Sequence, residues 1–512
     1  MGSEGSMCSR GVLLLRKNTP QRTSTVERND ISDCTHWKKV LPLHAMLTLK
    51  RYTPYYKQIF HLALPVVLAQ AGQLTTQFAD TAMVGNFGSN DPVPLAAVSL
   101  GSSLFLLIYL AALGLALAIT PLVGEHYARG DRRMVAILFE NGVSYCSIIG
   151  VVATAVALAL RPFIGVLGEW MSTPGEDITA VVDIALPYYD MLVWSIMPLM
   201  LFLAVKQFLE GIGNTSTAMW ITLGGNVVNI VLNYVFIFGN WGAEAMGAEG
   251  AGLATLLARG GQMVAIVAYF FLSRRLRIYR ALFDAKPLRK RHLRKLLNMG
   301  YPISFQMVLE SAAFILTSIL ALSFGTVAGG AMQVSFSIAN VAWMITVAIG
   351  SASTILVSHI YGAKEREQLR PTVMATYHLG LAWGILMAAV FVVFREPIAS
   401  LFTDNSEVIT LSAELMLLIA IYQLSDAVQG LSISMLRGIQ DVRIIMPIVL
   451  CSYLLINIPA GILLAYTFGL ESHGLVIGLI LGLSTAALLT SLRLRHRIRL
   501  WEMHTVTTTN KQ

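Results

Sequence analysis

Twelve long runs of apolar residues constrain the fold of this chain more than any other sequence feature. A helix that crosses a hydrocarbon core of ~30 Å needs about 20 such residues, and its backbone must be hydrogen-bonded within the span. Of 512 residues, 55% are hydrophobic and only 13% charged, whereas about a quarter are charged in an average globular domain. The sequence therefore predicts an all-α polytopic membrane protein with spans near 58–84, 95–121, 135–160, 178–203, 217–238, 251–273, 297–322, 331–357, 371–394, 409–434, 444–466 and 474–492.

Basic residues alternate between the two sides of these spans. From Met46 onward, one set of loops and termini holds 27 Lys and Arg, whereas the opposite set holds only Arg161 and Arg395. Because Lys and Arg concentrate in cytoplasmic loops, both termini are predicted to be cytoplasmic in a multi-pass protein of the cytoplasmic (inner) membrane. The net charge is +8, but the basic residues lie in loops between spans and not on the face of a soluble domain. The charge therefore does not indicate nucleic-acid binding.

The two halves of the chain resemble each other. Three anchors recur at offsets of 237, 234 and 227 residues: Pro65 with Pro302, the loop 126–131 with 360–365, and Gly211 with Gly438. Six spans return the chain to its starting side, so the two repeats are expected to be parallel. We therefore divide the chain into a disordered extension (1–45), an N-terminal six-helix lobe (46–273), a basic cytoplasmic linker (274–295), a C-terminal six-helix lobe (296–499) and a cytoplasmic tail (500–512).

Ionisable residues inside the spans are the candidate functional residues, because a charge in lipid is costly unless it has a partner or faces a cavity. Asp80, Glu310 and Asp426 lie in spans one, seven and ten. The alternative role for each is a hydrogen bond between helices. Asn229 and Asn233 share one face of span five, and amide and carboxylate oxygens together are typical ligands of hard cations. The alternative role for these two asparagines is again hydrogen bonding between helices.

Two further buried charges, Asp190 and Arg259, lie at similar depths in spans four and six, and we expect them to form a structural ion pair. The four cysteines lack the spacing of a zinc site or a disulfide framework. No catalytic motif is found, so an enzyme is not indicated, and no cofactor is expected.

Several motifs together resemble the multidrug and toxic compound extrusion (MATE) transporters, in particular their NorM-like branch. The resemblance extends from Met46 to about Arg499. The motifs are Phe78–Gly85, Glu210–Asn214, Asn229–Tyr234, Gly250–Thr255, Glu310 and Tyr422–Gln429.

The resemblance implies a cation-coupled antiporter that exports cationic or amphipathic drugs, with two lobes arranged as a V around a central cavity. It also implies two coupling regions. Some relatives carry an acid where Asn233 stands, so the first region departs from their pattern. The residues that match family positions are Asp80, Asn229, Asn233 and Thr255 in the N-terminal lobe, and Glu310, Tyr422 and Asp426 in the C-terminal lobe.

The resemblance implies Na⁺ or H⁺ as the coupling ion. Two carboxylates close together repel unless a cation lies between them or one takes a proton, and the Tyr422 ring could add attraction for a bare cation, so sodium is favoured. Expected partners are small-molecule drugs, the coupling cation and membrane lipid, with the protein as a monomer. The alternative functions are a lipid-linked glycan flippase of related architecture, and a channel or membrane-embedded enzyme.

Overall fold

The computed structural model describes residues 37–87, 93–171, 178–283 and 289–509. The chain forms two compact units, 1–51 and 52–512, and the following description concerns the second. Helix α1 begins at Trp37, before the boundary expected at Met46, because Val40, Leu43 and Leu47 recur at helical spacing. Most of the expected extension, 1–36, lies outside the described residues. The expected tail is also partly helical, since the last helix continues to Thr509.

Within the described ranges every regular element is helical. The first half contains α1 (Trp37–Gly85), α2 (Val93–Ala116), α3 (Ile119–Ala128), α4 (Arg132–Leu160), α5 (Phe163–Met171), α6 (Thr179–Trp194), α7 (Ile196–Gly211), α8 (Thr215–Phe238), η1 (Asn240–Gly242), α9 (Ala248–Leu272), η2 (Arg274–Leu276) and α10 (Arg277–Ala281). The second half contains α11 (Lys290–Leu322), α12 (Thr326–Ala363), α13 (Arg366–Val393), α14 (Arg395–Ala399), α15 (Ser406–Gly438), α16 (Ile445–Val449), η3 (Leu450–Asn457), α17 (Ile458–Ile462), η4 (Leu463–Thr467) and α18 (Glu471–Thr509).

These elements form 12 segments long and apolar enough to cross a membrane, which confirms the predicted number. Three of the spans are interrupted. α2 and α3 form one span, as do α6 and α7, which meet at Ser195. The eleventh span alternates α-helix with the π-helical segments η3 and η4, around Pro447 and Pro459. Since π-turns rotate side chains relative to a regular helix, they place Tyr453 differently from a simple periodic prediction.

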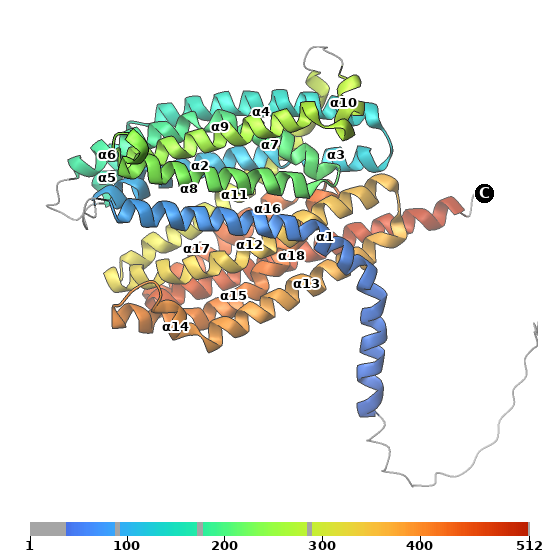
Figure 1. Cartoon of the computed structure of the whole chain (residues 1–512). Helices are drawn as coiled ribbons and strands as arrows, with labels where there is room; N and C mark the ends of the chain where they lie inside the picture. The colour runs from blue at the N-terminus through green and yellow to red at the C-terminus, as the bar shows by residue number, and fades with distance from the viewer. Residues whose placement is uncertain (1–36, 88–92, 172–177, 284–288, 510–512) are drawn as a thin grey trace, which may run out of the picture. The chain divides into compact units, whose positions relative to one another are not determined.

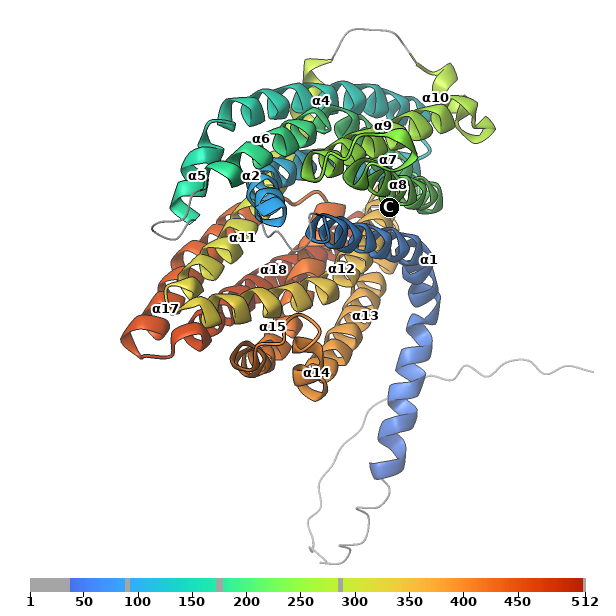
Figure 2. The ribbon, with the colours of Figure 1, turned by 60° about the vertical axis from the view of Figure 1, so that its left-hand side comes forward.

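In the 52–512 unit, helices α2–α9 group together and helices α12–α18 group together (Figures 1 and 2), whereas α1 also contacts the second half, where the Tyr56 hydroxyl lies 2.8 Å from His378 Nδ1 on α13. In the first half α4 packs on α7 and α9 packs on α6 and α8, whereas in the second half α15 packs on α12, α13 and α18. The halves meet where α2 contacts α11 and α3 contacts α12. Gly124 lies against Ser358, and a Cβ added to this glycine would lie 2.1 Å from the serine Oγ. These residues differ by 234 positions, the offset of the adjacent repeat anchor, so equivalent points of the two repeats meet at this contact.

The two lobes are closed against each other at the end that carries the basic loops. Glu125, only 6% exposed, accepts a hydrogen bond through Oε2 from Gln440 Nε2 at 2.6 Å. It also pairs with Arg129 and, at 3.8 Å, with Lys295. On the other lobe, His359 Nε2 lies 2.8 Å from the Gly211 carbonyl oxygen. A Cβ on Gly362 would lie 2.1 Å from the Glu125 carbonyl oxygen, so the backbones themselves touch here.

Glu125→Ala should loosen this closure, because it removes the side chain that joins Gln440 and Lys295 to α3. A cysteine placed at the buried Ser358, in a background without native cysteines, should then react several-fold faster with a polar maleimide. Asp131→Ala is the control, since Asp131 is an exposed acid near the same end that caps α4. Equal labelling rates for Glu125→Ala and its parent would contradict a closing role for Glu125.

Candidate functional site

The four residues predicted in the N-terminal lobe lie together in the structure. Asn233 on α8 donates through Nδ2 to Asp80 Oδ1 on α1 and, at 3.3 Å, to Asn229 Oδ1 one turn earlier. Asn229 Nδ2 lies 3.4 Å from Thr255 Oγ1 on α9. Both asparagines are buried, and Asn233 Oδ1 has no hydrogen-bond partner among the described residues. Three helices therefore contribute to one polar cluster that retains an unused acceptor.

The expected pair between Asp190 and Arg259 was wrong. Asp190 instead pairs with Arg161, whose Nε lies 2.9 Å from Oδ1 and whose terminal nitrogen lies 3.0 Å from Oδ2. This hydrogen bond raises the pKa of Arg161. The similar depths of Asp190 and Arg259 in their spans did not identify the partner of Asp190. The end of α4 at Leu160 and the rotation of the helices place Arg161 beside α6 instead. Asp190 therefore belongs to an ion pair at the end of the lobe opposite the basic loops.

Arg259 instead lies next to the N-terminal polar cluster. It is one turn after Thr255 on α9 and donates through a terminal nitrogen to Ser195 Oγ at 2.5 Å. The guanidinium also stands 5.3 Å from the centre of the Phe105 ring, and it interacts electrostatically with Asp80. Ser195, at the break between α6 and α7, thus supplies the hydroxyl that accepts a hydrogen bond from the buried Arg259 guanidinium.

In the C-terminal lobe, Glu310 on α11 is the centre of a hydrogen-bond network. Gln306 donates through Nε2 to Glu310 Oε2 at 2.5 Å, and the Tyr453 hydroxyl donates to Oε1 at 2.9 Å. Gln429 Nε2 lies 3.4 Å from the same Oε1. Arg437 in turn donates to Gln306 Oε1 at 2.5 Å. Both oxygens of the carboxylate therefore receive donors.

Asp426 differs from Glu310 in having an unused oxygen. It is 2% exposed, and its Oδ2 has no hydrogen-bond partner among the described residues. Glu310 interacts electrostatically with both Asp426 and Tyr422, which is one turn earlier on α15. The Tyr422 ring also packs edge-on against Phe314 at 6.2 Å. The structure thus brings the three predicted C-terminal residues into one buried cluster.

Four members of this network were missed from the sequence. Gln306 is one turn before Glu310, and Gln429 is three residues after Asp426, so helical spacing was an available signal for both. Arg437 directly precedes Gly438, which was considered only as a repeat anchor. Tyr453 gave no comparable signal, because it comes from the π-helical part of another span.

No group of three or more His, Cys, Asp or Glu side chains placed to hold a metal is found in the described parts of the chain. The two clusters offer instead carboxylate, amide and hydroxyl oxygens, which suit hard monovalent or divalent cations.

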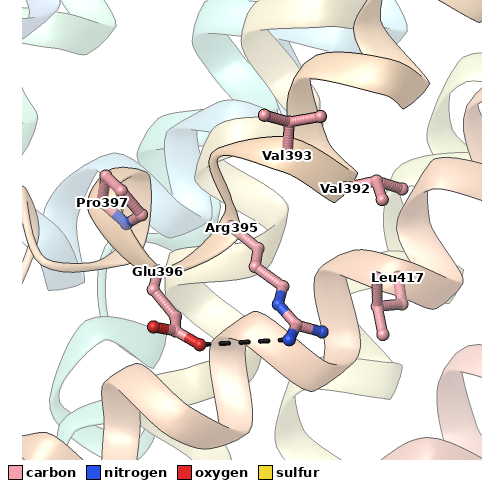
Figure 3. A pocket seen from close by; sticks show the side chains of 6 residues that line it. All are labelled: Val392, Val393, Arg395, Glu396, Pro397 and Leu417. Carbon is pink, nitrogen blue, oxygen red and sulfur yellow. Dashed lines mark ion pairs between the residues drawn. The ribbon is translucent and has the colours of Figure 1, made fainter.

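A surface cavity of about 440 Å³ lies elsewhere, beside α13, α14 and α15. Figure 3 shows the ion pair between Arg395 and Glu396 that lines it, at 4.0 Å, with Val392, Val393 and Leu417 nearby. None of the cluster residues lines this cavity, so it does not enter the functional argument.

Comparison with known proteins gives a consistent result. The family model described as MatE matches residues 65–235 and 302–463, so it matches once in each lobe and begins at the prolines that anchor the repeat. The chain is 30% identical to "Multidrug resistance protein NorM" of Photobacterium profundum over 453 residues, covering 87% of this chain and 96% of that protein. It is also 30% identical over 451 residues to "Multidrug resistance protein MdtK" of Edwardsiella ictaluri, with the same coverage.

Solved structures share the fold. The eukaryotic MATE transporter AtDTX14 superimposes with a TM-score of 0.78 at 18% identity, covering 88% of this chain and 99% of that one. A multidrug resistance MATE family transporter in an outward-facing conformation gives 0.76 at 20% identity, covering 88% and 97%. The predicted fold class and the resemblance stated from the motifs are both confirmed. The chain is an integral multi-pass membrane protein that belongs to the MATE family of transporters, and it is not an enzyme.

Proposed function

We propose that this protein exports cationic or amphipathic drugs in exchange for Na⁺, which binds at Glu310 and Asp426. The observation that carries the proposal is the unused Oδ2 of Asp426, buried in a cluster that contains a second carboxylate. A buried acceptor without a partner is costly, and two neighbouring acids repel each other. A bound cation relieves both costs. The names of the multidrug relatives support drugs as the exported class.

Exchange of Na⁺ for a drug follows because both compete for the negative charge of Glu310 and Asp426. A cationic drug and Na⁺ both neutralise buried carboxylates, so binding of one disfavours binding of the other. Transport further requires that each ligand prefers a different conformation of the two lobes. The contacts at Glu125 and His359 close one side of the lobes in the present conformation. Release of those contacts would then open the basic end for drug entry.

We assign Asp80, Asn229, Asn233 and Thr255 to a second coupling region in the N-terminal lobe. Their support is the shared hydrogen-bond network and the unpaired Oδ1 of Asn233. Arg259 lies beside this region and acts electrostatically on Asp80, so the single acid of this region has a basic partner.

The charge distribution supports an inner-membrane orientation with both termini cytoplasmic, since the basic loops gather at the closed end. We expect the protein to act as a monomer. A glycan flippase is not favoured, because the curated relatives reported above are named for multidrug resistance.

The decisive experiment is drug transport in proteoliposomes with independently imposed Na⁺ and pH gradients. An inward Na⁺ gradient at equal pH should drive export, whereas a pH gradient without Na⁺ should drive little. Export that depends on the pH gradient and ignores Na⁺ would overturn the choice of ion. Absence of drug transport under either gradient would instead contradict the antiporter assignment.

A further inference from the structure

The charges around the C-terminal cluster are not balanced. It contains two acids, Glu310 and Asp426, and Glu310 acts electrostatically on Asp426. The one basic side chain that acts on Glu310 among the described residues is Arg437, and no basic side chain in that part of the chain acts on Asp426. With both carboxylates ionised, the sum is two negative charges and one positive charge, which leaves a net charge of −1.

Arg437 acts on Glu310 through Gln306 and not by direct contact. A guanidinium has only donors, so its hydrogen bond at 2.5 Å fixes the amide oxygen of Gln306 toward Arg437. The amide nitrogen must then face Glu310, to which it donates at 2.5 Å. The bridge therefore presents a donor to the Glu310 carboxylate.

The N-terminal cluster provides an internal comparison. Asp80 is its one acid, and Arg259 acts on it electrostatically. One negative and one positive charge sum to zero there, so this cluster is neutral before any ion arrives. With their carboxylates ionised, the C-terminal cluster therefore has a net negative charge and the N-terminal cluster does not.

We propose that Arg437 determines the valence and number of the coupling ions: it is a built-in cation that leaves room for one monovalent cation at Glu310 and Asp426. This inference rests on the proposed sodium coupling and deepens it. A single Na⁺ brings the cluster to neutrality, whereas a divalent cation leaves an excess positive charge in a medium of low dielectric. One-for-one exchange of Na⁺ for a monovalent drug would then move no net charge.

Equilibrium binding of radioactive Na⁺ to the purified full-length protein tests this directly, with Ca²⁺ as competitor. The wild type should bind one Na⁺ with a Hill coefficient near one, and Ca²⁺ should compete poorly. Arg437→Gln removes the positive charge and makes the net charge of the cluster −2, so Ca²⁺ should compete with Na⁺ about tenfold better or more. Arg437→Lys keeps the charge and should keep the wild-type preference, even where Na⁺ affinity falls.

A second variant covers the case in which Arg437→Gln fails to fold. Gln306→Glu also brings the net charge to −2 while it leaves Arg437 an acceptor, so it should improve Ca²⁺ competition in the same way. Arg161→Gln is the matched control, since it removes an arginine paired with an acid in the other lobe. It should leave Na⁺ and Ca²⁺ binding unchanged.

The outcomes separate the two proposals. Folded Arg437→Gln or Gln306→Glu protein with wild-type Ca²⁺ competition would overturn the role of Arg437 while sodium coupling stands. Two Na⁺ per wild-type chain that are both lost in Glu310→Gln would overturn it as well. A wild type that binds no more Na⁺ than Glu310→Gln would refute the sodium site itself, and the role of Arg437 with it.

Discussion

Glu310→Gln and Asp426→Asn should each reduce Na⁺-driven drug export by at least about tenfold, and the double variant should be little worse than either single one. Each substitution removes one negative charge with little change of shape. Since the site needs a net charge of −1 to hold a monovalent cation, either loss makes it neutral and removes the attraction for Na⁺. The second substitution then has little left to remove.

Export rates in proteoliposomes, normalised to the amount of protein, measure this effect. Glu414→Gln is the control, because Glu414 lies on the same helix α15 but is 55% exposed and pairs with His473. It should transport like the wild type. Losses that multiply in the double variant would contradict a shared site and indicate that Glu310 and Asp426 act independently.

Asp80→Asn should abolish export while the protein still inserts and folds. The change replaces the charged carboxylate that accepts the Asn233 hydrogen bond with a neutral amide, and it leaves the Arg259 charge without its acid. A buried uncompensated charge is costly, so the N-terminal cluster should rearrange and lose its coupling to the lobe movement.

The measurement is drug export at matched membrane abundance, together with the melting temperature of the purified variant. Asp190→Asn is the control, since it also removes an acid from the N-terminal lobe, but from the pair with Arg161. It should retain most export. Wild-type export by a folded Asp80→Asn protein would assign Asp80 to hydrogen bonding between helices, the alternative that the sequence left open.

The sequence predicted which polar residues lie close together more successfully than it predicted the partners of the buried ion pairs. Asp80, Asn229 and Asn233 were expected together, and their hydrogen bonds connect them in the structure. The pairing of Asp190 with Arg259 was wrong, although both residues were correctly placed inside spans. Hydropathy gives depth along the membrane normal, but it gives no rotation about the helix axis, and the choice between Arg161 and Arg259 depends on that rotation.

By itself the sequence determined the number of spans, the distribution of basic loops and the internal repeat. Each of these is a property of the chain read in order, because insertion into lipid depends on local apolar length and on flanking charge. Only the tertiary structure decided that Arg437 acts on Glu310 through Gln306, and that Tyr453 reaches the same carboxylate from a π-helical segment. Those contacts join α11 to α15 and to the eleventh span, and they depend on how helices far apart in sequence pack and rotate against one another.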